Sequence, residues 1–367
     1  MAMAPKVICL GEALVDRLGP LGGDPASAAP EQCDDRLGGA PANVACALAQ
    51  LGTASAFVGR LGCDPIGEAF ERLMVARGVE LAGLQHDPTR PSRVVLVRRH
   101  ADGERVFQGF QGHSTQVHHG RDQGFADQAL EVASLEQAWP ELAAQASWLL
   151  AGTIPLATPQ SAEALQWAVD AALAGGLRLA LDVNWRPTFW HEDSDPSAGP
   201  DAAAQEVMAP LLRRASLLKL AREEAQWLFG STDPVVISAA LPQAPDVVVT
   251  DGAHPLRWLM DGAHGSLAVL APPAVVDTTG AGDAFSAGLL HQLVQAEVQA
   301  QPPEPELMLR FAAACGALVC AGAGAIDPQP DARTVEEFLR WASSRPQPPN
   351  ATGWPAGQPL EPGGREA

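Results

Sequence analysis

Apolar runs that end near glycine or a polar residue alternate along the chain with stretches of helical spacing. A short run rich in β-branched residues is typical of a buried strand, and apolar positions three and four residues apart are typical of a helix. The pattern predicts strands at "VICL", "SAFVGRLG", "SWLLAG", "RLALDVN", "SLLKLA" and "DVVVTDG". It predicts helices over residues 41–51, 67–77, 158–174, 201–214, 222–229, 281–297, 304–320 and 334–343.

Two segments depart from this alternation. "SRVVLVRRHADGERVFQGF" carries two β-rich runs around Asp102 and Gly103, which is a strong hairpin signal. Residues 257–260 and 267–270 are expected to pair as a hairpin at the edge of the sheet. Polar, glycine-rich sequence follows the first strand up to Gly39.

Strands that alternate with helices imply a mostly parallel sheet covered on both faces. Ligands of such sheets bind beyond the carboxyl ends of the strands. Five segments follow predicted strands directly and should meet at that edge. They are residues 11–16, 152, 182–186, 221–224 and 250–252.

Composition narrows the possible partners. A net charge of -19 and a pI near 4.8 argue against binding to nucleic acid or to an anionic membrane. No apolar run reaches the roughly 20 residues of a membrane span, and Gly11 and Glu12 come too early for a secretory signal. Six scattered cysteines suggest small core residues in a reducing cytoplasm, so we expect a cytoplasmic protein. Residues 345–367, rich in proline and glycine, are predicted to be disordered.

The string "DTTGAGDAF", residues 277–285, places two glycines and a carboxylate at the start of an apolar helix. The amides of Gly280, Ala281 and Gly282 would present N–H groups to an anion at the helix N-terminus. Asp283 would then take the proton from an attacking hydroxyl. For a bare GxGD, an ordinary loop followed by a helix-start acid remains the alternative.

This string and "RLGGAPANVA", residues 36–45, resemble the two signatures of the ribokinase-like (PfkB-type) carbohydrate kinases. The order of elements is also similar from about residue 7 to 339, and "DVNWRPTFW" and "FADQAL" look most like fructokinases. The resemblance implies a three-layer α/β sandwich with a mostly parallel central sheet over residues 1–344. A small β lid would come from about 12–36 and 93–112.

The implied activity is ATP-dependent phosphorylation of a sugar hydroxyl, with fructose as the first choice of acceptor and fructose 6-phosphate as the product. Ribose, a nucleoside or a 2-keto-3-deoxy sugar acid remain alternatives, as does a catalytically silent kinase fold that binds or regulates. No GxGxxG follows the first strand and no Walker-A motif occurs, which argues against dinucleotide enzymes and P-loop kinases. The implied partners are a sugar and ATP with Mg²⁺. A homodimer is left open.

The resemblance also assigns residues by position. Asp16, Gly38, Gly39 and Asn43 would hold the sugar together with Asp283, although each alone is equally explained as a cap, a turn or a helix-start amide. Two positions, Thr250 and Gly252, would border the nucleotide. The cation-binding segment would comprise Asp277, Thr279 and Gly324, and a monovalent cation such as K⁺ is its implied occupant.

The strand ends add further candidates. Arg186, which follows Asp182 and Asn184, offers positive charge to a phosphate, or else forms a loop-stabilising pair with the aspartate. In "LKLAREE", Glu224 occupies the glutamate position of the family's Asn-x-x-Glu, where it would orient the waters of Mg²⁺, but Ala221 replaces the asparagine. Lys219 would then contact phosphate directly, or else is a surface lysine.

A second departure from the family lies in the region expected near the adenine. Ala313 stands where many relatives place an asparagine. The sequence therefore leaves purine selectivity open to relaxation.

Overall fold

The computed structural model describes residues 5–99, 105–111, 124–272 and 274–344. Among these residues, nine strands form the large sheet in the order β13-β12-β11-β10-β9-β8-β1-β4-β5. They are β1 (Val7–Leu10), β4 (Ser55–Gly62), β5 (Leu84–Asp87), β8 (Trp148–Ala151), β9 (Arg178–Asp182), β10 (Leu217–Ala221), β11 (Asp246–Asp251), β12 (His254–Met260) and β13 (Ala263–Leu267). Neighbours from β11 to β5 run parallel, and β12 and β13 add an antiparallel edge.

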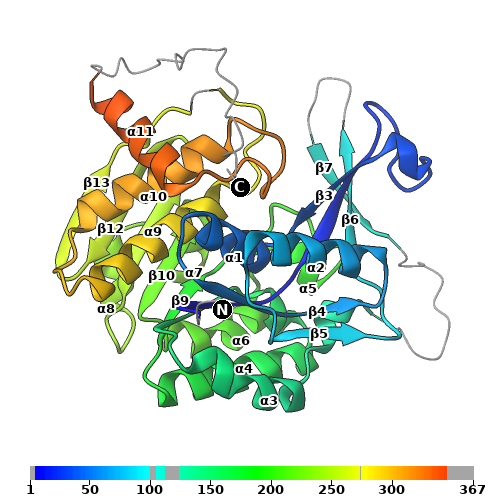
Figure 1. Ribbon diagram of the computed structural model, residues 1–367, viewed down its shortest axis with the longest axis horizontal. Helices are drawn as coiled ribbons and strands as arrows, with labels where there is room; N and C mark the ends of the chain where they lie inside the picture. Colours follow the sequence, from blue (N-terminus) through cyan, green and yellow to red (C-terminus); the bar gives the residue numbers. More distant parts are fainter. Residues whose placement is uncertain (1–4, 100–104, 112–123, 273, 345–367) are drawn as a thin grey trace, which may run out of the picture.

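Helices cover both faces of this sheet. One face carries α1 (Ala40–Gln50), α2 (Pro65–Arg77), α9 (Ala281–Val298), α10 (Pro305–Val319) and α11 (Ala332–Ser343). The other face carries α3 (Val132–Ala143), α4 (Pro159–Ala174), α6 (Ala202–Leu212), α7 (Arg222–Phe229) and α8 (Pro234–Ala239). Figure 1 shows α2 and α3 on opposite sides of β4 and β5. The predicted three-layer α/β architecture is therefore confirmed.

Burial on both faces explains why the strands are apolar throughout. All eight residues of β4 are buried, and the large sheet separates two hydrophobic clusters. Phe57 packs with the α1, α2 and α9 side, whereas its neighbour Val58 packs with the α3 and α4 side. Alternate side chains of a strand thus reach both layers, as the parallel arrangement requires.

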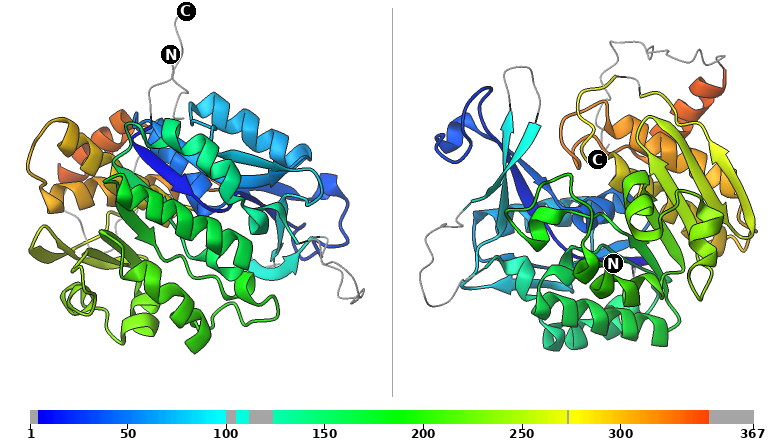
Figure 2. Two further views of the ribbon diagram at one scale, coloured as in Figure 1. Left: turned by 90° about the horizontal axis from the view of Figure 1, so that it is seen from below. Right: turned by 180° about the vertical axis from the view of Figure 1, so that it is seen from behind.

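A smaller sheet stands beside the main body in the order β3-β2-β6-β7 (Figure 2). Its strands are β2 (Leu14–Leu18), β3 (Asp34–Gly38), β6 (Arg93–Arg99) and β7 (Arg105–Phe110). A third apolar cluster joins its base to η2 (Ala126–Ala129) and α5 (Pro187–Trp190): Leu14, Val95 and Phe110 pack with Phe125 and Phe189. The short helices η1 (Pro30–Gln32) and η3 (Ile154–Ala157) complete the described elements.

The small sheet falls in the segments expected to form a lid, and the predicted pairing of its hairpin strands is present as β6 and β7. The predicted turn at Asp102 and Gly103 lies outside the described residues, as does the predicted disordered tail at 345–367. That the sheet closes over a substrate stays a prediction.

Two expectations from the sequence were wrong. The second edge strand is β13 at Ala263–Leu267, not 267–270, because its pairing with β12 selects a segment that is mostly exposed. Cys63 is exposed and Cys33 half-buried, so only four of the six cysteines are core residues.

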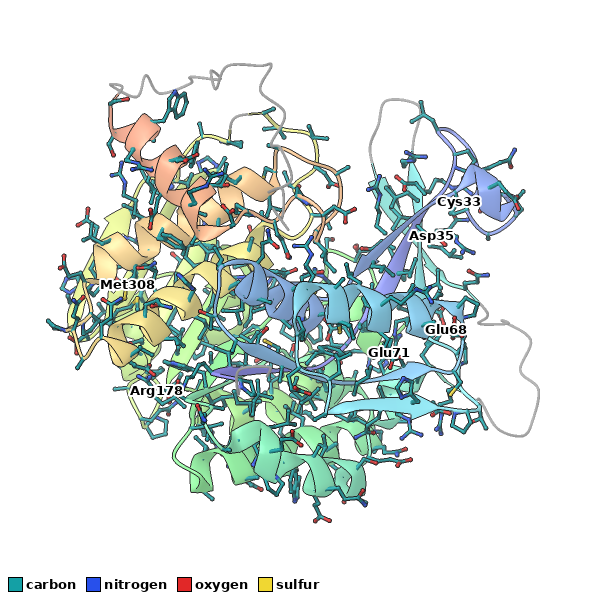
Figure 3. The ribbon with its side chains drawn as sticks, in the orientation of Figure 1. Cys33, Asp35, Glu68, Glu71, Arg178 and Met308 are labelled. Atoms are coloured by element: carbon teal, nitrogen blue, oxygen red, sulfur yellow. The ribbon has the colours of Figure 1, made fainter. Side chains whose placement is uncertain are left out.

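Contacts of Glu297 with Trp148 and Arg178 fix the C-terminal end of α9 to the large sheet. Trp148 Nε1 donates to Glu297 Oε1 at 3.0 Å, and Arg178 pairs with the same carboxylate while its guanidinium stacks over the Trp148 ring at 4.0 Å. Figure 3 shows where Arg178 lies on the main body. Because α9 carries Asp283 at its other end, this contact helps to fix the direction of the helix that presents the candidate base. None of the helices in the described ranges is long and apolar enough to span a bilayer.

Candidate active site

The loop before α9 has the geometry predicted for an anion cradle. Gly280 adopts φ 78° as the residue before the helix, a conformation that glycine takes without strain. Asp277 fixes the approach to it: Oδ1 accepts from the Thr279 N–H at 3.0 Å and from the Thr279 hydroxyl at 2.7 Å, and Oδ2 accepts from the Gly324 N–H at 3.0 Å. The cation-binding segment is thus brought together, with both of its loops tied to one carboxylate.

The predicted amides are not equivalent. The Ala281 N–H donates to the Thr278 carbonyl at 3.3 Å, whereas Gly282 is exposed at the start of the helix. First-turn N–H groups have no carbonyl in a preceding turn of their own helix. Gly282 is therefore the better placed of these two amides to meet a phosphate.

Gly280→Ala is expected to lower the free energy of unfolding by about 2–4 kcal/mol, combining left-handed strain with overpacking. A Cβ at this position would lie 2.5 Å from Ala325 Cβ and 2.7 Å from its Cα. Gly52→Ala is the matched control, since Gly52 has φ 91° but an added methyl group there would meet nothing within 4 Å. Urea unfolding of both variants measures the difference, and equal losses would contradict the role of the Ala325 contact.

Asp283 meets Asn43 across the two signature segments. Asn43 Nδ2 donates to Asp283 Oδ2 at 2.7 Å, although 240 positions separate them in the chain. Burial raises the pKa of Asp283 above its ordinary value; the hydrogen bond from Asn43 opposes this, and the negative charge of Asp182 adds to it. A carboxylate with a raised pKa is a stronger proton acceptor once it is ionised.

Lys219 supplies a positive charge beside Asp182 and the Gly282 backbone. Its Nζ lies 2.9 Å and 3.1 Å from the two oxygens of Asp182, its register partner on β9, and Ser286 Oγ donates to the same carboxylate at 2.9 Å. Burial lowers the pKa of Lys219, but the charge and hydrogen bonds of Asp182 outweigh it and the pKa is raised. A Cβ on Gly282 would lie 3.1 Å from Nζ. The ammonium group therefore sits beside the Gly282 backbone, so Lys219 is not a surface lysine.

Glu224 is buried and both of its oxygens accept backbone N–H groups. Oε1 accepts from Trp185 at 2.7 Å and Oε2 from Ala221 at 2.7 Å. Burial raises its pKa, and the nearby Asp182 charge adds to the effect. The observed task of Glu224 is thus to fix the start of α7 and the loop after β9. Its contact with Mg²⁺ through water stays a prediction.

The predicted sugar residues gather around the same point. A Cβ on Gly38 would lie 3.5 Å from Asp16 Oδ2 and 3.9 Å from Asn43 Oδ1. Gly39 has φ 102°, and a Cβ there would lie 2.6 Å from the Glu12 carbonyl oxygen. The two glycines therefore bring the backbone close to both polar groups, and at Gly39 any side chain would collide.

Two other candidates, Arg186 and Asn184, lie in the loop that follows β9. Arg186 is exposed, donates to the Trp185 carbonyl at 2.9 Å, and its charge lowers the pKa of Asp283, so it faces the base. Asp182, the alternative partner of Arg186, bonds Lys219 instead. Asn184 has φ 44° in the same loop.

The two candidates for the nucleotide border lie at the end of β11. Thr250 donates to the Leu220 carbonyl at 3.3 Å, and Gly252 turns the chain into β12 with φ 54°. Ala313, the second departure from the family pattern, is buried in α10. The contacts of Thr250 and Gly252 are explained by the turn itself, so both nucleotide assignments stay predictions.

Sequence reasoning missed several polar residues next to the site: Glu12, Arg93, Asp127 and Ser286. Glu12 is buried, and its Oε1 accepts from the Ala40 N–H at 3.0 Å. Arg93 and Asp127 form a buried bidentate pair at 2.9 Å and 3.1 Å. The only sequence signal was the position of Glu12 directly after a buried strand, where a carboxylate is unusual.

Comparisons with known proteins identify the family of the chain. Residues 4–332 match the family model described as pfkB family carbohydrate kinase. The chain is 33% identical to the probable fructokinase-6, chloroplastic, of Arabidopsis thaliana over 342 residues, which cover 92% of this chain and 83% of that protein.

Solved structures of fructokinases are also similar to this chain. The fructokinase of Xylella fastidiosa with bound ATP is 29% identical with a TM-score of 0.74, covering 92% of this chain and 99% of that one. A double mutant of the fructokinase of Vibrio cholerae O395, in a fructose-, ADP- and potassium-bound form, is 26% identical with a TM-score of 0.69, covering 92% and 99%.

Proposed function

Since the chain belongs to the pfkB family and is an ATP-dependent carbohydrate kinase, we propose that it phosphorylates fructose on its 6-hydroxyl. The observation that carries this proposal is the contact between Asn43 and Asp283 beside Lys219, which assembles a base and a phosphate-facing cation from distant segments. The relatives named as fructokinases favour fructose over ribose, a nucleoside or a 2-keto-3-deoxy sugar acid.

The residues divide the chemistry between them. Asp283 accepts the proton of the sugar hydroxyl as that oxygen attacks the γ-phosphorus of ATP, and Asn43 holds the carboxylate in place through Oδ2. Lys219 and the Gly282 amide stabilise the charge on the transferred phosphoryl group, and ADP leaves. Asp16 and the Gly38–Gly39 backbone orient the acceptor.

The chemistry of the donor groups fits the implied ions. A nucleotide-bound Mg²⁺ would neutralise phosphate charge, and Glu224 after β10 would face its waters, whereas the Ala221 side chain offers them no hydrogen bond. The two loops of the cation-binding segment are joined through Asp277, which would bring backbone carbonyls of both loops within reach of a K⁺ ion. The potassium-bound Vibrio fructokinase supports this assignment.

A screen of sugars with ATP and Mg²⁺ tests the function, with ADP release coupled to NADH oxidation and the product checked by ³¹P NMR. We expect fructose to give the highest kcat/KM. A higher kcat/KM with ribose, a nucleoside or a 2-keto-3-deoxy sugar acid would contradict the acceptor but not the chemistry. The rival, a silent kinase fold, predicts ATP binding without transfer to any sugar; Ala221 favours that rival, and the Asn43–Asp283 contact opposes it.

Ala221→Asn is expected to lower the Mg²⁺ concentration for half-maximal rate by up to about 10-fold, the lower end of the scale for outer-shell metal partners. Ala221 is the residue that precedes α7 and has no side-chain cap, so asparagine should also stabilise the helix. Ala221→Ser is the matched control, because serine caps equally well but is too short to replace the amide. If both variants raise Tm and neither shifts the Mg²⁺ titration, the metal role of this segment is wrong.

A further inference from the structure

Glu12 is a buried carboxyl group that the proposed chemistry does not use. Its side chain is 2% exposed, and it follows β1 at the point where the chain enters the small sheet. One oxygen is occupied, since Oε1 accepts from the Ala40 N–H at 3.0 Å. The other, Oε2, is buried without a hydrogen-bond partner among the described residues.

The occupied oxygen holds the start of α1. Gly39 precedes that helix and has no side chain to cap it, so the Glu12 carboxyl group satisfies a first-turn N–H from another segment. Asn43 lies in the same turn and donates to Asp283 Oδ2 at 2.7 Å. Two hydrogen bonds and one helical turn therefore connect Glu12 to the candidate base.

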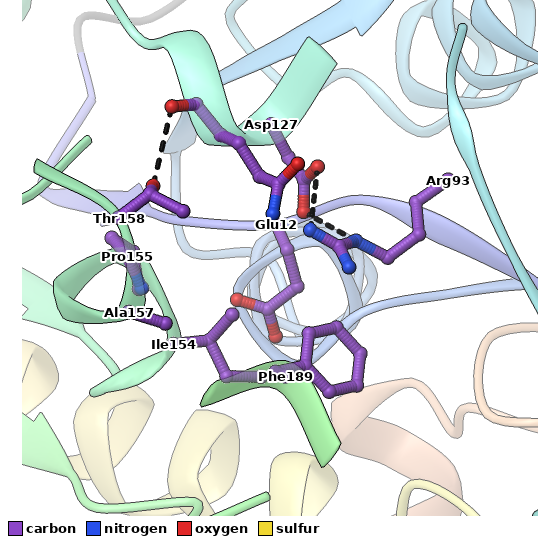
Figure 4. A pocket seen from close by; sticks show the side chains of 9 residues that line it. Glu12, Arg93, Asp127, Ile154, Pro155, Ala157, Thr158 and Phe189 are labelled. Carbon is purple, nitrogen blue, oxygen red and sulfur yellow. Dashed lines mark hydrogen bonds and ion pairs between the residues drawn. The ribbon is translucent and has the colours of Figure 1, made fainter. Parts of the chain in front are cut away.

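The Glu12 side chain also lines a cavity at the base of the small sheet. Figure 4 shows the Glu12 side chain at the centre of this cavity, between the Arg93–Asp127 pair and the side chains of Ile154 and Phe189. The cavity measures about 10 Å³, close to the least room that one water molecule needs. The cavity therefore has room for at most one water molecule beside the Glu12 carboxyl group.

The nearest cation is already committed to another carboxylate. Arg93 bonds both oxygens of Asp127 and packs against the rings of Phe110, Phe125 and Phe189 at 4.5–4.9 Å. An ionised carboxylate that is stabilised by backbone N–H groups alone, with no cation of its own, is costly to bury. The charges that face Glu12 from α9 and η2, Asp283 and Asp127, are both negative.

We propose that Glu12 is a positioning residue that works as a neutral acid, holding the first turn of α1 and through it Asn43 and Asp283. The proposal rests on the function proposed above in so far as Asp283 is the base. Glu12 also links the base of the small sheet to the reacting end of the site, because its side chain lines the cavity there and bonds the first turn of α1.

The titration of Glu12 supports this interpretation. Burial raises its pKa to about 8, the backbone N–H groups of Glu12 itself and of Ala40 oppose the rise, and the negative charges of Asp127 and Asp283 add to it. At neutral pH the folded protein therefore holds a proton that the unfolded chain, with a pKa near 4.5, has released. Stability must then fall as the pH rises from about 4.5 to about 8 and stay level above it.

Two variants test whether Glu12 acts as a neutral hydrogen-bonding group or through a negative charge. Glu12→Ala removes the acceptor for Ala40 and should lower kcat by about 10–100-fold, within the scale for a displaced reacting group, with little change in the KM for ATP. Glu12→Gln keeps an acceptor and a donor without the charge, and should recover most of that loss below pH 8. Glu80→Ala is the matched control, because Glu80 accepts from the Leu81 and Ala82 N–H groups away from the site.

Two further readouts do not need activity. The Tm of Glu12→Gln relative to wild type should rise between about pH 4.5 and 8 as the wild type loses stability. Amide exchange at Ala40 should be faster in Glu12→Ala and unchanged in Glu12→Gln. If the protein phosphorylates no sugar, the proposed function fails while these readouts still test the inference.

Three results would overturn the inference. They are a Glu12→Gln variant as slow as Glu12→Ala, a Tm difference that does not vary with pH, and an amide exchange rate at Ala40 that neither substitution changes. The first means that the charge is required, the second that Glu12 is ionised throughout, and the third that it does not hold α1.

Discussion

Asp283→Asn is expected to lower kcat by about 10²–10⁴-fold, the contribution of a positioned general base. The amide can still accept the hydrogen bond from Asn43 Nδ2, now 2.7 Å from Oδ2, so the first turns of α1 and α9 keep their contact. What it cannot do is accept the proton of the sugar hydroxyl. Sugar affinity, measured by calorimetry, should change little.

The control for this substitution is Asp201→Asn. Asp201 also begins a helix, α6, and accepts from the Ala204 N–H at 2.8 Å, a role that asparagine fills equally well. Its kcat should equal that of wild type. A variant Asp283→Asn that retains more than about a third of wild-type kcat would exclude Asp283 as the base.

The pH profile gives a second check on the same residue. Asp283 accepts a proton only when it is ionised, and burial raises its pKa above the ordinary 3.8. Activity should therefore be lost as the pH falls through that raised pKa, with an acid limb above 3.8. An acid limb at or below the ordinary value would mean that another group limits the reaction.

Gly282→Val is expected to lower turnover by about 10²-fold or more, the scale of losing one positioned hydrogen-bond donor to a developing charge. A Cβ at Gly282 would lie 3.1 Å from Lys219 Nζ, and the two further methyl groups of valine would occupy the space where the phosphoryl group meets the amide. Lys219 cannot retreat freely, because Asp182 holds it at 2.9 Å. Sugar binding, which we assign to Asp16 and Asn43, should remain close to wild type.

Gly282→Ala should lower turnover by an intermediate amount. The clash of a single methyl falls on the end of a lysine side chain, which can move by a few tenths of an ångström, so alanine should fall between glycine and valine. Steady-state kinetics and ATP calorimetry measure the series. If valine leaves both ATP affinity and turnover unchanged, the phosphate does not approach Gly282.

The parallel core could be predicted because its signal is local. In β4 every residue of "SAFVGRLG" is buried, and such runs between helical stretches are recognisable in the sequence alone. β2 and β3 have no such local signal and were expected only from the family resemblance, because their polar residues are satisfied by non-local pairing: Arg17 bonds both oxygens of Asp35 across the two strands. The predicted position of β13 was a few residues too late for a related reason. Four of its five residues are exposed, and only its pairing with β12 defines it.

The site was predictable where a motif lies at the start of a helix, as at Gly280 and Asp283. The pairing of Lys219 with Asp182 was not predictable, because it depends on β9 and β10 being neighbours in a particular register. Glu12 was missed because its position after a buried strand is a weak signal, and its bond to the Ala40 N–H depends on the fold. Contacts between segments far apart in the chain require the fold.

The most direct test of the central claim is ³¹P NMR of fructose incubated with ATP, Mg²⁺ and either wild-type protein or Asp283→Asn. We predict that the wild type forms fructose 6-phosphate and ADP in equal amounts and that the variant forms neither at a comparable rate. If the wild type binds ATP but transfers no phosphate to fructose or to any sugar of the screen, the chain is a binding or regulatory protein on a kinase fold, and the account given for Asp283 is wrong.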